Sequence, residues 1–247
     1  MISNVSSQKD LLRQFILSNL KYLIEEGGGG VDISLPHFKL YPRDYIGFAE
    51  MELQTHDNRS LINCIAHLKR AVDCQLDTFF HVLGLSRAFA KRNLKFDKKL
   101  EFLAASGIFS ARTLSRLNTI RNRMEHDYDI PRIHDLEAYF DLVVAFVSVM
   151  ERTILMIIEN ERGYSIVRSD EDYEDFDGMK IAKYWFTITY DFAKSRITTE
   201  WKTEVGEKSL VVDTSDIQEF AYFLRVFLLL SQRDAFASDK YIISQLK

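Results

Sequence analysis

Proline and glycine are scarce in this sequence, which contains 3 prolines and 10 glycines among 247 residues. Four of the glycines are consecutive, at positions 27–30. Because both residue types interrupt regular structure, their scarcity leaves long uninterrupted segments and favours helix. A hydrophobic content of 47% with 28% charged residues excludes a disordered chain and predicts a packed globular protein.

Cysteine is also rare, because Cys64 and Cys74 are the only two. They lie ten residues apart in one expected helix, about 15 Å along its axis, which is too far for a disulfide. The sequence has no CxxC motif and no Cys/His cluster of zinc-binding spacing. We therefore expect two free thiols, no metal and no cofactor.

Long apolar runs are absent as well. The most apolar stretch, FLRVFLLL at 223–230, is too short to span a bilayer and contains an arginine. The first ten residues have neither the basic start nor the apolar centre of a signal peptide. These features predict a soluble cytoplasmic protein with no membrane partner.

Charge is distributed unevenly along the chain, whose formal net charge is −4. The stretch 87–123 contains ten basic residues and only two acidic ones, Asp97 and Glu101. This pattern fits either a solvated basic helix face or a surface that binds nucleic acid.

Apolar residues recur at helical spacing through the first two thirds of the chain. The pattern predicts helices over 7–26, after Pro42, over about 58–84, from Asp97 to Ala105, from Ser110 into the 119–131 stretch, and from Pro131 to about 162. We expect residues 1–162 to form an antiparallel helical domain with its core at 45–162 and a flexible glycine connection at 27–30.

The character of the sequence changes after residue 162. Six acidic and no basic residues occur in 169–178, so 163–179 is expected to be an acidic linker or loop. Strict alternation over 196–205 predicts a half-buried strand, with 181–192 as its hairpin partner and 210–212 as a short third strand. SDIQ at 215–218 fits a capping box that opens a helix. The expected fold is therefore mainly α, with a small α+β C-terminal part at 180–247.

The segment TIRNRMEHDYDIP, at 119–131, ends the basic stretch. Asn122 and His126 are four residues apart and share one helical face. Arg121 lies about 140° from His126 on an ideal helix, so the two converge only if the helix frays or a second chain contributes one of them. Spacing alone also fits ordinary surface roles, an ion pair of Arg121 with Glu125 and a helix-end role for His126.

Arg121, Asn122 and His126, followed by Asp127 and Tyr128, resemble the motif of the HEPN superfamily, in its R-x4-H-x-Y form. The stretch 66–73 resembles HEPN helices less specifically. The resemblance covers roughly residues 45–162 and implies a HEPN-type helical bundle. It also implies a metal-independent endoribonuclease that acts as a homodimer with a composite site, as in bacterial toxin–antitoxin or antiphage-defence systems.

The resemblance implies a role for each motif residue. His126 would be the general acid/base, Arg121 would stabilise the phosphate, and Asn122 would hold the imidazole or the phosphate. RNA cleavage through the 2′-OH would give a 2′,3′-cyclic phosphate and a 5′-OH. Tyr128 would be modified by a nucleotidyltransferase-type antitoxin or would stack on RNA. The expected RNA-binding residues of the basic stretch are Arg112, Arg116, Arg123, Lys98 and Lys99.

Two other interpretations of the motif remain open. The chain could be a non-catalytic HEPN module for dimerisation or partner binding, although a pure scaffold has no need to retain Arg121, Asn122 and His126 together. It could also be a helical protein in which the motif occurs by chance and the basic stretch binds nucleic acid or protein. His126→Ala discriminates the enzyme from both.

Overall fold

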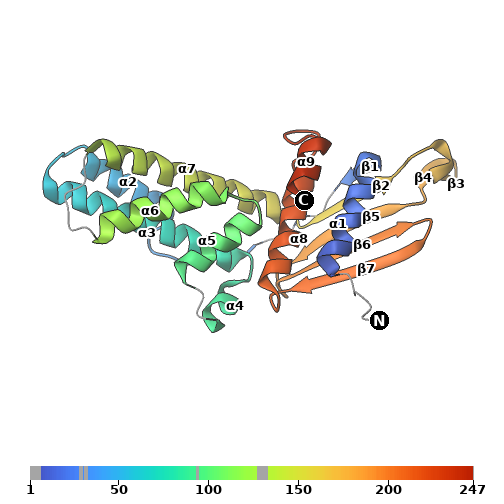
Figure 1. The fold of residues 1–247 in the computed structure, drawn as a ribbon, viewed down its shortest axis with the longest axis horizontal. Helices are drawn as coiled ribbons and strands as arrows, with labels where there is room; N and C mark the ends of the chain where they lie inside the picture. The colour runs from blue at the N-terminus through green and yellow to red at the C-terminus, as the bar shows by residue number, and fades with distance from the viewer. Residues whose placement is uncertain (1–6, 28–29, 31–32, 93–94, 127–132, 247) are drawn as a thin grey trace, which may run out of the picture. The chain divides into compact units, whose positions relative to one another are not determined.

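The computed structural model describes residues 7–27, 30, 33–92, 95–126 and 133–246, with positions 114, 121 and 124–126 described only as helix backbone. The chain divides into two compact units, and Figure 1 shows their elements. The helical unit is 33–155, and the sheet unit combines 1–32 with 156–247. Among the described residues, no helix has the length and apolar character needed to cross a membrane.

The helical unit is an all-α assembly. Its helices are α2 (Pro42–Leu53), α3 (Asn58–Val82), α4 (Ser86–Lys91), α5 (Phe96–Ala105), α6 (Ala111–His126) and α7 (Ile133–Ile158), whose last three residues fall in the sheet unit. Side-chain caps fix two helix starts, because Asp57 accepts a hydrogen bond from the Ser60 amide at 2.8 Å and Ser110 accepts one from the Thr113 amide at 3.1 Å. Gly84, with φ +65°, follows α3 in the left-handed conformation that favours glycine.

Aromatic rings form much of the core of the helical unit. Phe80 on α3 lies 4.4 Å from Phe89 and 5.5 Å from Phe102, between ring centroids. Phe109 stacks on Phe146 of α7 at 5.0 Å. These contacts explain why the short helix α4, which the sequence pattern did not predict, is held in place: its Phe89 is buried between α3 and α5.

The sheet unit contains a five-stranded antiparallel sheet in the order β1-β2-β5-β6-β7. Its strands are β1 (Leu23–Gly27), β2 (Glu161–Ile166), β5 (Trp185–Asp191), β6 (Arg196–Thr203) and β7 (Gly206–Asp213). A separate hairpin joins β3 (Tyr173–Phe176) to β4 (Met179–Ala182). The helical elements are α1 (Gln8–Asn19), η1 (Leu20–Tyr22), η2 (Asp170–Asp172), α8 (Ile217–Leu230) and α9 (Asp239–Gln245).

One face of this sheet is covered by α1 and α8. Phe15 of α1 stacks on Phe186 and Trp201 at 5.1 and 4.5 Å between ring centroids. Phe220 of α8 contacts Tyr190 of β5 edge-on at 6.0 Å. Side chains of β5 alternate between buried and half-buried, as expected for a strand with one covered face.

The prediction of one N-terminal helix over 7–26 was wrong in its second half. α1 ends at Asn19, and Leu23–Gly27 forms β1, in which Leu23 pairs with Ile166 of β2. Leu23 is buried and Ile24 is exposed, which is strand alternation. Leu20, Leu23 and Ile24 fit a helical period equally well, so the local pattern could not distinguish the two structures.

The predicted domain boundaries also differ from the structure. α1 belongs with the C-terminal sheet, not with the helices of 33–155. The expected linker at 163–179 is regular structure: it contains most of β2, then η2 and β3. Asp172 is buried and accepts hydrogen bonds from the backbone amides of Arg168 at 2.7 Å and Ser169 at 3.3 Å, which fixes the turn into the hairpin.

Other expectations are confirmed. β5 pairs with β6 and β6 with β7, and the helices predicted after Pro42, over 58–84, to Ala105 and from Ser110 are all present. Both cysteines are free. The cap of α8 lies one residue later than expected, because Asp216 and not Ser215 accepts hydrogen bonds from the first amides of this helix. The expected opening of α7 at Pro131 lies outside the described residues.

Replacing Phe15 tests the assignment of α1 to the sheet unit. Phe15 is 7% exposed and stacks on two rings of the sheet, so Phe15→Ala should lower the free energy of unfolding by about 3–5 kcal/mol. Both tryptophans lie in β5 and β6, so urea unfolding followed by tryptophan fluorescence reports on this unit. Gln14→Ala, at an exposed position of α1, is the matched control. An unchanged midpoint for Phe15→Ala would contradict the packing.

Candidate functional site

The HEPN-like motif lies at the C-terminal end of α6, which stays helical from Ala111 through His126. Its start is fixed by the Ser110 cap, and Asn118 ties its middle to α5 by donating to Asp97 at 2.9 Å. Tyr128 lies outside the described residues. The structure therefore tests the backbone placement of Arg121 and His126, but not the expected role of Tyr128.

The helix is continuous from Arg121 to His126, which sets the angle between these two positions within one chain. The two positions are five residues apart along the helix, which places them about 140° apart around the axis. Fraying between them is not found, because the helical backbone continues through both. Fraying within 121–126 therefore does not bring the two positions together, and the expected fraying near Pro131 lies outside the described residues.

Burial around α6 shows which positions face the bundle. Leu117 is 1% exposed, whereas Arg116, Asn122 and Arg123 are exposed. At about 100° per residue, position 121 lies about 40° from Leu117, on the bundle side of the helix. Position 126 lies about 40° from Asn122, on the exposed side. The helix thus separates the two expected catalytic positions, and it keeps Asn122 with the histidine position.

Three arginines form a row along the exposed side of α6, and we call Arg112, Arg116 and Arg123 the arginine row. Their positions fall within about 40° of one another around the helix axis. All three are exposed, and none forms an ion pair with another described residue. Position 126 is three residues beyond Arg123, the spacing of neighbours on one helical face. Unpaired guanidinium groups in such a row are suited to binding phosphates.

The two lysines expected to bind RNA are engaged elsewhere. Lys98 pairs with Glu101 on the same helix at 2.7 Å. Lys99 pairs with Asp77 of α3 at 2.7 Å and lies 5.7 Å from the centre of the Phe80 ring. The structure therefore divides the five expected RNA-binding residues into three arginines on α6 that pair with no described residue and two ion-paired lysines on α5.

Metal-ligand clusters and reactive thiols were the two other kinds of site to look for among the described residues. They include no group of three or more His, Cys, Asp or Glu side chains that could hold a metal ion. Burial raises the pKa of the Cys64 thiol to about 12 and that of Cys74 to about 11. Both thiols are therefore protonated at neutral pH, which makes them poor nucleophiles.

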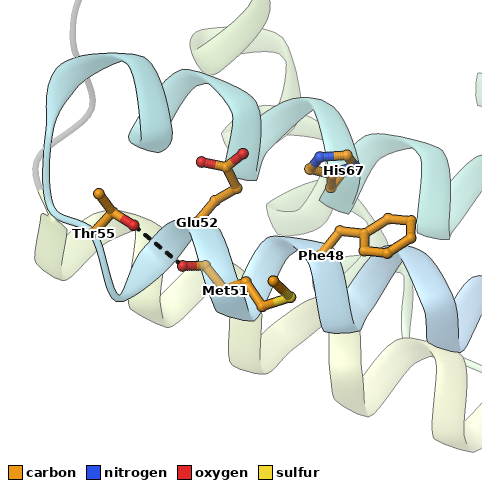
Figure 2. A pocket seen from close by; sticks show the side chains of 5 residues that line it. All are labelled: Phe48, Met51, Glu52, Thr55 and His67. Carbon is orange, nitrogen blue, oxygen red and sulfur yellow. Dashed lines mark hydrogen bonds between the residues drawn. The ribbon is translucent and has the colours of Figure 1, made fainter.

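A pocket of about 310 Å³ lies between α2 and α3, lined by Phe48, Met51, Glu52, Thr55 and His67. Figure 2 shows the Glu52 side chain extending from α2 toward α3, where its carboxylate accepts a hydrogen bond from Asn63 at 3.2 Å. The sequence pattern does not reveal this pocket. Its one signal in the sequence is the spacing of Phe48, Glu52 and Thr55 on one side of the helix expected after Pro42.

His67 is the central polar group of this pocket. Its ring packs against Tyr45 and Phe48, at 6.5 and 5.5 Å between centroids. Burial and the positive charge of Arg70 lower the pKa of His67 below its ordinary value, so the imidazole is neutral at pH 7. Nδ1 is buried and has no hydrogen-bond partner among the described residues.

Comparisons with models of known families, with curated proteins and with solved structures found no match to this chain.

Proposed function

We propose that this chain is a metal-independent endoribonuclease of the HEPN type, acting as a homodimer in a toxin–antitoxin or antiphage-defence setting. The observation that carries the proposal is the exposed side of α6, where Asn122, the arginine row and position 126 lie together. The motif resemblance supplies the chemistry, and this placement makes that chemistry accessible to a polyanion.

The proposed reaction is cleavage through the ribose 2′-OH. One histidine, His126, removes the proton from the 2′-OH, whose oxygen attacks the adjacent phosphorus. The bond from phosphorus to the 5′-oxygen breaks, and that oxygen takes a proton from the partner chain's copy of the same histidine. The products are a 2′,3′-cyclic phosphate and a 5′-OH. Every proton is moved by imidazole, so the scheme needs no cofactor.

A dimer accounts for the position of Arg121. Position 121 faces away from position 126 on the same α6, so its guanidinium stabilises the phosphate in a site completed by the second chain. Asn122, one turn before position 126, orients the imidazole or the phosphate. The helix geometry and the resemblance both support a site that two chains complete.

Charge supports an RNA substrate for the helical unit. Residues 33–155 contain seventeen Lys and Arg against fifteen Asp and Glu, a net charge of +2, whereas the sheet unit carries −6. Positive charge is exposed on α6, where the arginine row forms no ion pair with the part of the chain that the structure describes. Neutralised phosphates release counterions, which makes such binding favourable and salt-dependent.

A non-catalytic HEPN module for dimerisation or partner binding is the alternative function. It would use the same bundle without proton transfer at His126. A regulator of the nucleotidyltransferase type, acting on Tyr128, and a cytoplasmic location also belong to the proposal.

Replacing His126 tests the catalytic role. With general acid/base catalysis removed, His126→Ala should cut RNA at least about 100-fold more slowly than the wild type. Cleavage is followed on labelled RNA with EDTA present, and the product ends are identified by their 2′,3′-cyclic phosphate. His134→Ala, at an exposed histidine of α7, is the control. Equal cleavage by His126→Ala and wild type would reject the role, and cleavage that requires added metal would reject the mechanism.

The arginine row generates a separate prediction about binding. Each of Arg116→Ala and Arg123→Ala should make the slope of log affinity against log salt less negative by about 0.7 for single-stranded RNA. The measurement is fluorescence anisotropy at several salt concentrations, in the His126→Ala background so that the RNA stays intact. Lys98→Ala removes an ion-paired charge of the same unit and should change the slope less. Identical slopes for all four proteins would show that the row does not contact phosphates.

A further inference from the structure

The α2–α3 pocket lies at the end of the helical unit where α6 also ends. α3 leads away from the α2–α3 turn, and α6 leads back, so α6 ends at the same end of the unit as that turn (Figure 1). Of the pocket residues, Glu52 lies in the last turn of α2 and Thr55 in the α2–α3 turn itself. The pocket and the last turn of α6 therefore occupy one end of the same compact unit.

The groups that line the pocket restrict the ligand. The only charged group among them is the Glu52 carboxylate, which accepts hydrogen bonds but cannot donate them. An anionic group such as a phosphate would be repelled here. A ligand with N–H donors fits, particularly two adjacent donors that face both oxygens of one carboxylate.

His67 adds a hydrogen-bond donor beside this acceptor. No described residue accepts a hydrogen bond at its buried Nδ1, so the tautomer protonated at Nε2 avoids burying an unpaired N–H. A neutral imidazole of this tautomer donates through Nε2 to an acceptor atom. The polar groups of the pocket thus combine an acceptor on α2 with a donor on α3.

Phe48 and Met51 supply the apolar surface. Phe48 is 38% exposed and Met51 is 68% exposed, so a ring and a thioether border the pocket and remain open to solvent (Figure 2). Planar bases stack on aromatic rings in proteins that bind single-stranded RNA. A volume of about 310 Å³ is at the small end for ligand pockets and suits one ring system better than a large cofactor.

We infer that the α2–α3 pocket binds a guanine base of the RNA, with N1–H and the 2-amino group donating to Glu52, O6 accepting from His67, and the ring stacked on Phe48. Guanine carries two adjacent donors beside an acceptor on its Watson–Crick edge, whereas adenine, cytosine and uracil have a single donor there. The inference rests on the proposed ribonuclease function, because the substrate supplies the base. A cationic peptide side chain is disfavoured by the net positive charge of the unit.

The test measures binding of guanosine, which has no phosphate, to the full chain by saturation-transfer NMR. Guanosine should bind the wild type more tightly than adenosine, and more tightly than inosine, which lacks the 2-amino group. Glu52→Gln should weaken guanosine binding at least about tenfold, because a charge-assisted hydrogen bond is replaced. Glu50→Gln removes an exposed charge of α2 outside the pocket and should leave binding unchanged.

Several outcomes would overturn the inference. Guanosine could fail to bind, bind no better than adenosine, or lose affinity equally in both glutamate variants. Displacement of guanosine by a short oligoarginine peptide would assign the pocket to a basic protein partner. If Met51→Glu converts a dimer into a monomer in light scattering, the pocket is an interface between copies of the chain.

The measurement also separates this site from the nuclease. Guanosine binding is read without RNA cleavage and should persist in His126→Ala. If the wild type binds guanosine but does not cleave RNA, the base site is kept and the ribonuclease function is rejected. If the wild type cleaves RNA and His126→Ala does not, but guanosine fails to bind the wild type, the ribonuclease function is kept and the base site is rejected.

Discussion

Burial of Leu117 fixes the rotation of α6 about its axis, and each role proposed for this helix depends on that rotation. Because an α-helix has 3.6 residues per turn, burying one position determines which of its other positions are exposed. Once Leu117 faces the bundle, the arginine row and position 126 face solvent, and position 121 turns inward. A rotation of about 100° would turn Arg116 toward the bundle, and the exposed arginine row on which the shared site depends would be lost.

Helices that depend on residues close to one another in the sequence could be predicted from it. The caps at Asp57 and Ser110 and the long apolar stripe of α7 follow from residues within one or two turns, so these helices were predictable. The shared face of Asn122 and position 126 was predictable for the same reason. Leu23–Gly27 was not, since its strand forms only by pairing with β2, some 140 residues later.

Long-range pairing also explains the errors in the domain boundaries. The acidic composition of 169–178 correctly indicated a solvated surface, because most of these side chains are exposed. It carried no information on the backbone, which is ordered by the buried Asp172 carboxylate and by the β3–β4 pairing. The α2–α3 pocket escaped prediction in the same way. Its residues come from two helices, and only their packing shows that Glu52 and His67 line one cavity.

Under the proposed function, the arginine row would hold RNA and the α2–α3 pocket would select it. Guanidinium groups contact the phosphate backbone, which is the same for every sequence, so the arginine row alone gives affinity without selectivity. Selectivity requires contacts to base edges, and for RNA these come from unstacked bases of single strands. A neutral imidazole and one carboxylate are suited to that task, because they match hydrogen-bond donors and acceptors without attracting phosphates. The lowered pKa of His67 therefore matters: a protonated ring beside Glu52 would form an ion pair and lose the polar pattern that distinguishes one base from another.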